Sequence, residues 1–263
     1  MKRIRTILIV TLLSMLFPFT QSCVGFDDDM ESINQDMGNT YNAALATVIT
    51  ASEVPGAAVL EKDNGELAYV VNPDMLTRAD ANKEGQRIFY RYVGSDSPNG
   101  QTNSKGPYIS ITEVVMKILT KPIDFLREGE EDVYGQDGIY IVSHSLSEKY
   151  LTLQFQIMAS NKNIAHRISL VAKEDATPDA EGYLTIELRH NAEGDTPESI
   201  SYPGYVSFLL TDAPGYKEGT LKGYKMKYRT INQGEETVTI NRIGESKRMS
   251  LLQWANTYNT KIK

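Results

Sequence analysis

The stretch AAVLEKDNGELAYVV, residues 57–71, carries the clearest local structural pattern in the chain. Two apolar runs flank Asn64-Gly65, and an Asn-Gly pair supplies the positive φ angles that a type I′ hairpin turn requires. The stretch therefore predicts a β-hairpin and indicates that the first half of the chain is built from antiparallel strands.

The segments on both sides of this hairpin keep a period of two residues. Ala46, Val48 and Thr50 fall on one face of a preceding strand. In QRIFYRYVG, residues 86–94, Ile88 and Tyr90 share a face with Tyr92, and Arg87, Phe89 and Arg91 share the other. Polar and turn-forming residues fill 94–106, which is long enough for a hairpin tip or a binding loop. The apolar run in 107–123 fits either a short helix or another strand.

The second half alternates more strictly between apolar and polar residues. Leu151, Leu153, Phe155 and Ile157 face one way, and Thr152, Gln154 and Gln156 face the other. The same pattern returns at 168–170, 184–188, 206–210 and 224–228, with turn-forming residues between the runs. Many short strands with one apolar face predict an antiparallel sandwich or barrel, so the expected fold class is all-β.

An acidic, glycine-bearing segment, LREGEEDVYGQD at 126–137, separates the two halves. It lacks the D-x-[DN]-x-[DN]-G pattern of a calcium loop, so we interpret it as a domain boundary. We expect one domain over 42–130 and a second over 131–243. Residues 244–263 fit either a short amphipathic helix or a loose tail.

The N-terminus has the pattern of a secretory signal peptide. Three basic residues precede an apolar stretch that ends at Pro18, and the stretch is too short for a membrane span. A small residue, Ser22, then stands directly before Cys23, which resembles a bacterial lipobox. That resemblance implies cleavage of residues 1–22 and attachment of a diacylglycerol and an acyl chain at Cys23. More than one acyl chain is needed for firm anchoring in the membrane.

Cys23 is the only cysteine in the chain, so the sequence predicts no disulfide and no thiol nucleophile. Residues 23–41 are polar and carry Asp27, Asp28 and Asp29 shortly after the anchor. The segment reads as a flexible tether. The aspartates also resemble the surface-export signal of Bacteroidetes-type lipoproteins, and both interpretations stay open. The expected location is the cell envelope, at the outer membrane and on either of its faces.

The charge of the chain argues against two kinds of partner. The net charge is −7, and residues 1–22 hold three cations and no anion, so their removal leaves about −10. Nucleic acid binding requires basic patches, and a body lying on anionic lipid requires them too. We therefore expect no nucleic acid partner, and a membrane contact only through the lipid at Cys23.

The sequence contains no recognisable catalytic or metal-binding motif. The three histidines, His144, His166 and His190, show no helical ligand spacing, and no second cysteine could join them. Nucleophile-elbow and phosphate-loop motifs are missing as well. We predict no catalytic residue, no metal and no cofactor, and we expect the histidines to lie solvated on strands.

A resemblance to a known family rests on EGYLTIELRHNAEGD at 181–195. Its strand ending in L-R-H-N-A resembles the NigD-like lipoproteins of Bacteroidetes. The segments EGQRIFYRYV at 84–93 and VSFLLTD at 206–212 fit the same family. The resemblance implies an N-terminal OB-like barrel followed by a C-terminal β-sandwich. The family is linked by name to bacteriocin gene clusters, and it carries no established site residues.

The run RHNAEGD has two interpretations. Arg189, His190, Asn191 and Asp195 could form a polar binding patch. Alternatively, His190 and Asn191 end a strand, and the following residues turn, with Asn191 and Asp195 capping their own backbone. We favour the structural interpretation.

The function expected from the sequence is a non-enzymatic, membrane-tethered binding or accessory lipoprotein. Its ligand would be a glycan or a protein, by analogy with the binding faces of OB folds. One alternative is an immunity protein that captures a toxin, and another is an unrecognised hydrolase. An aromatic groove would favour a glycan, and a flat apolar patch would favour a protein partner.

Overall fold

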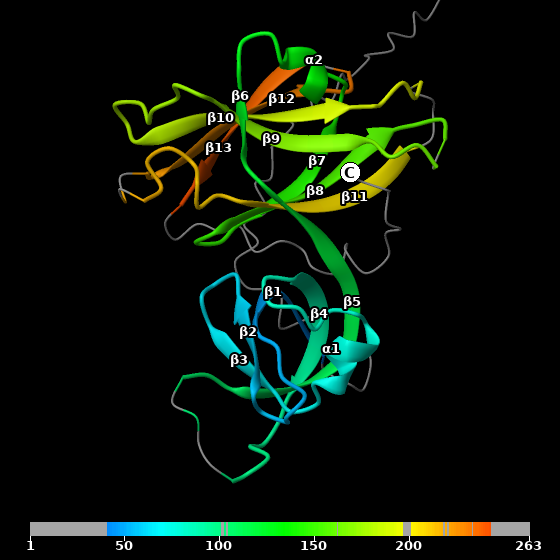
Figure 1. Cartoon of the computed structure of the whole chain (residues 1–263), viewed down its shortest axis with the longest axis vertical. Helices are drawn as coiled ribbons and strands as arrows, with labels where there is room; N and C mark the ends of the chain where they lie inside the picture. The colour runs from blue at the N-terminus through cyan, green and yellow to red at the C-terminus, as the bar shows by residue number, and fades with distance from the viewer. Residues whose placement is uncertain are drawn as a thin grey trace, which may run out of the picture.

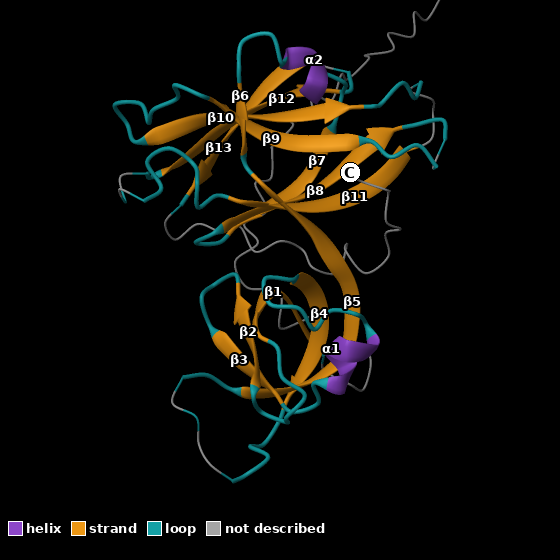
Figure 2. Cartoon of the chain, in the orientation of Figure 1, coloured by secondary structure: helices purple, strands orange, loops and turns teal. Residues whose placement is uncertain are grey.

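The computed structural model of the chain describes residues 41–242, except 101, 102, 104, 162, 197–200, 218, 220 and 233. The predicted signal peptide, the lipidation at Cys23, almost all of the tether and the C-terminal tail lie outside the described residues. The described part consists mostly of strands arranged in two bodies, a barrel-like ring and a two-layered sandwich (Figures 1 and 2). No described helix is long and apolar enough to cross a membrane.

Five strands and one short helix form the barrel-like ring. They are β1 (Asn42–Thr50), β2 (Ala58–Lys62), β3 (Leu67–Val70), α1 (Asp74–Arg78), β4 (Arg87–Gly94) and β5 (Tyr108–Pro122). The strands lie in the order β3-β2-β1-β4-β5, and a parallel pairing of β3 with β5 closes the ring. This connectivity agrees with the OB-like barrel that the family resemblance implies.

The predicted hairpin forms at residues 57–71. β2 and β3 pair antiparallel, with Glu61 opposite Leu67, and Gly65 has a φ of 82° in the turn between them. The inward-facing residues of all five strands fill the ring. This core comprises Ala46, Val48, Ala58, Leu60, Ala68, Val70, Leu76, Ala81, Ile88, Tyr90, Ile109 and Ile111.

The segment 107–123 forms a strand rather than a helix, because its β-branched residues fit an extended backbone. β5 runs for 15 residues and belongs to both bodies. Arg87 to Gly94 of β4 pair with Ile109 to Ile118 of β5, and Leu119–Pro122 then pair in parallel with β11. A single extended strand therefore connects the barrel to the sandwich (Figure 1).

Two stacked sheets form the sandwich. Its elements are β6 (Asp124–Leu126), α2 (Glu131–Tyr134), β7 (Tyr140–Leu146), β8 (Tyr150–Met158), β9 (Arg167–Lys173), β10 (Tyr183–Asn191), β11 (Ser201–Leu209), β12 (Gly223–Thr230) and β13 (Gly234–Asn241). One layer continues the barrel strands as β5-β11-β8-β7, and the other has the order β13-β12-β10-β9-β6. The alternation predicts antiparallel pairing throughout, but β5–β11, β10–β12 and β6–β9 pair in parallel.

The alternating residues of β8 show how the two bodies meet. Leu151, Leu153 and Phe155 are fully buried between the two sheets, as the pattern predicts. Thr152 and Gln154 on the opposite face are also buried, although a half-exposed sheet would leave them in water. Their face is covered because the barrel packs against it.

A small apolar cluster fills this junction. Leu45, Phe89, Met116 and Ile118 come from the outer face of the barrel, and Tyr205 comes from β11 of the sandwich. Phe89 is fully buried here, on the face of β4 opposite to the barrel core. The segment 126–137 begins at the last residue of β6 and contains α2. The assignment of 42–130 and 131–243 as separate domains stays a prediction.

Candidate functional site

The junction between the barrel and the sandwich is built around one buried cation, Arg87. Arg87 begins β4, and only 1% of its surface is exposed. Its two terminal nitrogens donate to the carboxylate oxygens of Asp63 at 2.5 and 3.0 Å. Asp63 stands in the β2–β3 turn, directly before Asn64-Gly65, so the hairpin turn places the carboxylate beside the guanidinium. This fork-to-fork pairing is the strongest geometry available to such a pair.

Arg87 also reaches across to the sandwich. Its second terminal nitrogen donates to the hydroxyl of Thr152 on β8 at 2.9 Å, and its Nε donates to the hydroxyl of Ser207 on β11 at 3.4 Å. The guanidinium lies 4.7 Å from the centroid of the Tyr150 ring. Ser145 of β7 donates to Asp63 at 3.3 Å. Groups from three sandwich strands therefore satisfy an ion pair that belongs to the barrel.

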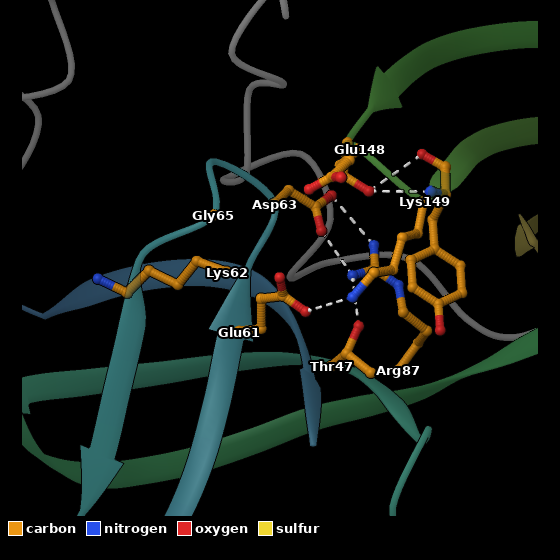
Figure 3. A pocket seen from close by; sticks show the side chains of 10 residues that line it. Thr47, Glu61, Lys62, Asp63, Gly65, Arg87, Glu148 and Lys149 are labelled. Atoms are coloured by element: carbon orange, nitrogen blue, oxygen red, sulfur yellow. Dashed lines mark hydrogen bonds and ion pairs between the residues drawn. The ribbon is translucent and has the colours of Figure 1, made fainter. Parts of the chain in front are cut away.

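The solvent side of this junction is nearly closed. Lys149 donates to Glu61 at 3.2 Å across the rim, whereas Lys62 points away from Arg87 toward Glu66 and Tyr92 (Figure 3). The remaining cavity is about 20 Å³. That volume holds roughly one water molecule. The junction is therefore a joint between the two bodies rather than a pocket for a sugar or a cofactor.

The sequence did not single out Arg87 or Asp63. In the sequence, Arg87 lies beside an apolar run and Asp63 lies in a tight turn. Neither position distinguishes a buried charge from a solvated one. Only the packing of the sandwich on the outer face of the barrel buries them together.

A second buried polar cluster contains two of the three histidines. His166 and His190 are 1% and 2% exposed, so the expectation that these histidines are solvated is wrong. They lie where β9 begins and β10 ends, and the two sheets close over them. His144, on β7, is half-buried. Among the described residues, no group of three or more potential ligands is arranged to hold a metal ion.

Asp195 lies at the end of this cluster. Its carboxylate accepts from the hydroxyl of Ser160 and from the backbone amides of Ser160 and Asn161, at 3.1 and 3.3 Å. It also lies 3.1 Å from the Nε2 of His166. The prediction that Asp195 caps its own backbone is wrong, because its carboxylate caps the segment after β8 instead.

The other two residues of the predicted patch lie in different environments. Arg189 pairs with Glu187 on the same face of β10. Asn191 accepts from the backbone amide of Glu193 at 2.8 Å, which confirms its predicted turn, and it donates to carbonyls of α2. Arg189, His190, Asn191 and Asp195 therefore do not converge on one point. Their role as a binding patch stays a prediction.

Burial changes the titration of the histidine cluster. Removal from water lowers the pKa of His190 to about 4, because an uncharged ring is favoured where no water solvates the cation. At Asp195, by contrast, hydrogen bonds favour the charged form of the side chain. The Ser160 hydroxyl, more than any other group, holds the pKa of Asp195 well below its ordinary value.

An aromatic pair lies on the outside of the barrel. Tyr69 and Tyr108 stand opposite each other in the parallel β3–β5 pairing, and their neighbours Val70 and Ile109 point into the core. Alternation along each strand therefore turns the two tyrosines outward. Their ring centroids are 5.8 Å apart at an angle of 53°.

Two loops border this aromatic pair. Gly56, in the β1–β2 loop, has a φ of 81°, and a Cβ placed on it would lie 3.2 Å from the ring of Tyr108 and 2.9 Å from Pro98. Pro98 belongs to the 94–106 loop, so this predicted binding loop lies beside the pair. Val54 of the first loop is 63% exposed. The barrel thus presents an apolar, aromatic surface formed by two half-buried tyrosine rings and the exposed Val54.

Comparison with known proteins identifies the second body. Residues 122–242 match the family model of the NigD-like C-terminal beta sandwich domain. The chain carries a NigD-like domain. This match confirms the family resemblance drawn from the L-R-H-N-A segment, and its range coincides with the end of β5 and the last described strand. No curated protein matches the chain.

Solved structures extend the likeness to the barrel. A protein of unknown function from Bacteroides vulgatus is 26% identical, with a TM-score of 0.62, over 77% of this chain and 90% of the other. A protein from Parabacteroides distasonis, whose name relates it to a toxin, is 25% identical, with a TM-score of 0.56, over 77% and 94%. A NigD-like immunity protein from Bacteroides caccae shares the fold at 17% identity, with a TM-score of 0.51, over 76% and 92%.

The Arg87→Met variant should be destabilised by about 3 kcal/mol, because it leaves the Asp63 carboxylate, whose side chain is only 16% exposed, without its partner. Adding Asp63→Asn should recover much of this loss, since no unpaired charge then remains. Denaturant unfolding of the single and double variants measures both effects.

The control for this pair is Arg91→Met. Arg91 pairs with Glu113 on the surface, with side chains 34% and 50% exposed, so its loss should change stability by less than about 0.5 kcal/mol. Equal effects of Arg87→Met and Arg91→Met would contradict the role assigned to the junction.

Stability should fall as the pH decreases from about 6.5 to about 4. The unfolded chain takes up a proton on His190 near pH 6.5, whereas the folded chain resists it until about pH 4. The unfolded state therefore binds more protons in this interval, which costs up to about 3 kcal/mol by its acid end. Denaturant unfolding at a series of pH values tests this, and His144→Gln should keep the same slope. A flat profile between pH 6.5 and 4.5 would show that His190 titrates normally.

Proposed function

We propose that the chain is a lipid-anchored, non-enzymatic binding protein of the cell envelope, located at the outer membrane. The predicted signal peptide and the lipobox-like Cys23 support anchoring. A neighbour of the same fold from Bacteroides fragilis is named as a lipoprotein. About 18 residues separate Cys23 from the first strand, and they can span at most roughly 60 Å. The barrel would thus be held near the membrane while its loops stay accessible.

The observation that carries the binding proposal is the Tyr69–Tyr108 pair on the outside of the barrel. Tyrosine provides a rigid contact area of mixed polarity at low entropic cost, and it is enriched at protein interfaces. The neighbouring Val54 and Pro98 add apolar surface. Strands 2 and 3 and the adjoining loops are also where OB folds bind ligands. We infer that this surface, from here on the aromatic face, is the recognition surface.

The aromatic face supports a protein partner better than a glycan. It is built on the outward-facing strand residues Tyr69 and Tyr108, beside the exposed Val54. A glycan site needs a groove that surrounds the sugar, whereas a protein partner needs an exposed apolar surface. The names of two structural neighbours, an immunity protein and a protein related to a toxin, support a toxin polypeptide as the class of partner.

A hydrolase is less well supported by the arrangement of polar groups. Ser160 and His166 both contact Asp195, as in a catalytic triad, but His166 is buried and Ser160 is only partly exposed. Each makes its hydrogen bonds within the protein, so no bound substrate is needed to satisfy them.

Replacing Cys23 with serine should release the protein from the membrane fraction, because the thiol that would carry the lipid is lost. Cell fractionation followed by immunoblotting, with mass spectrometry of the N-terminal peptide, measures the change. The unsubstituted chain serves as the control. A Cys23→Ser protein that still sediments with membranes would contradict lipid anchoring.

A photoreactive amino acid in place of Tyr69 should form discrete crosslinks to a protein in living cells. Thr237, an exposed residue of β13 on the sandwich, gives a matched control position that should form none. Gel shifts followed by mass spectrometry identify the products. Crosslinks of equal yield at both positions, or binding of the purified chain to a glycan array that Tyr69→Ala and Tyr108→Ala abolish, would overturn the protein-partner proposal.

A further inference from the structure

Three hydrogen bonds run in series through the buried histidine pair. The Nδ1 of His190 lies 3.0 Å from the carbonyl oxygen of Gly138, and its Nε2 lies 2.8 Å from the Nδ1 of His166. The Nε2 of His166 in turn lies 3.1 Å from Asp195 Oδ2. The two rings are nearly parallel, with an angle of 19° between them. Each of these bonds needs one proton, so the series needs three.

Two neutral imidazoles supply only two of these protons, because each carries a single N–H. The carbonyl of Gly138 can only accept, so the Nδ1 of His190 must donate to it. The remaining two bonds then require two more protons, and a neutral His166 provides one. The extra proton must therefore reside either on the carboxyl group of Asp195 or on one of the two rings.

Asp195 is an unfavourable position for that proton. Its oxygens already accept from one hydroxyl and two backbone amides, and a carboxylate accepts such bonds more strongly than a carboxylic acid does. The same contacts lower the pKa of the carboxyl group. Asp195 is therefore an acceptor for the Nε2 of His166, and the extra proton belongs to the imidazole pair.

The surrounding groups decide which ring holds the charge. The acidic groups near the pair are Asp137, from the segment before β7, and Asp195, from the loop after β10. Asp195 contacts His166 directly. The segment after β8 contributes the neutral groups of Ser160 and Asn161.

Two arginines on the adjoining strands form an ion pair or a hydrogen bond with other groups. Arg167 of β9 pairs with Glu193, and Arg229 of β12 donates to the backbone of Gln136.

We propose that His166 is a buried proton-binding site, an imidazolium at neutral pH that donates to His190 on one side and to Asp195 on the other.

The hydrogen-bonded cluster around this proton joins the two sheets of the sandwich through Gly138 and Ser160. Gly138 lies just before β7, and Ser160 lies just after β8, in one sheet. His166 lies just before β9, and His190 lies in β10, in the other sheet. If the proton leaves, His166 keeps the N–H that faces the Asp195 carboxylate, and its bare Nδ1 then lies 2.8 Å from the bare Nε2 of His190. The contact then becomes repulsive, so alkaline conditions should loosen this end of the sandwich.

Nuclear magnetic resonance of the ring nitrogens tests the proposal directly. In the 15N-labelled full chain at pH 7.5, both nitrogens of His166 should show the shifts of protonated nitrogens, and His190 should show a neutral ring protonated at Nδ1. Neutral rings at both positions would overturn the proposal. This outcome would not affect the proposed binding function, which depends on a different surface.

The Asp195→Asn variant sharpens the test. The asparagine oxygen takes the position of Oδ2, where two backbone amides donate, and the side chain is neutral, so His166 loses the anion that balances an imidazolium. The variant should fold, and its His166 should be neutral at pH 7.5. The control, Asp137→Asn, removes an acidic group that lies near His190 and accepts from the backbone amide of Ala192, and it should leave His166 protonated. A protonated His166 in Asp195→Asn would contradict the proposed pairing.

The same proton should appear in the pH dependence of stability. Between pH 7 and 8.5 the unfolded histidine is mostly neutral, so folding takes up a proton and stability falls as the pH rises. The unfolding equilibrium constant should increase by up to about tenfold per pH unit. Asp195→Asn should lack this increase in denaturant unfolding experiments. Identical slopes in the two proteins would overturn the proposal even if Asp195→Asn folds poorly.

Discussion

The arrangement of the two bodies depends on the ion pair between Arg87 and Asp63. An apolar contact such as that between Phe89 and Tyr205 holds surfaces together without fixing their relative angle, because it has no direction. A buried guanidinium is different, since it is stable only when nearly all of its donors are matched. Arg87 meets that requirement with a carboxylate from the barrel and hydroxyls from β8 and β11. The sandwich must therefore pack on the barrel in one orientation.

β8 carries this constraint from one end of the sandwich to the other. Thr152, near its start, contacts Arg87, and Ser160, just past its end, contacts Asp195. Both ends of the strand are thus held by buried charges, with apolar side chains between them. β5 adds a covalent connection, since it pairs with β4 in the barrel and with β11 in the sandwich. The described part of the chain is braced against bending between its two bodies at two places, the Arg87 junction and β5.

This bracing bears on the proposed function. A recognition surface on a rigid scaffold loses less conformational freedom when it binds a partner. The aromatic face lies on β3 and β5, and β5 is the strand that enters the sandwich, so movement of Tyr108 is limited by contacts in both bodies. Variation in the loops at 51–57 and 94–106 could change the partner without disturbing the junction or the histidine cluster.

Sequence alone determined the local features of this protein. Strand periodicity, the Asn64-Gly65 turn and the all-β class follow from side-chain alternation and turn chemistry, which depend on neighbouring residues. The L-R-H-N-A segment, with two further segments, gave the resemblance to NigD-like proteins, and the model of their C-terminal domain matches residues 122–242. Only the tertiary structure decided the state of the charged residues. Arg87 and Asp63 are 24 residues apart, and His166 and Asp195 are 29 apart. Local sequence cannot show which side chains meet over such separations, and burial depends on the packing of the second sheet and the second body. Solvated histidines were therefore the wrong expectation, and the buried arginine gave no signal.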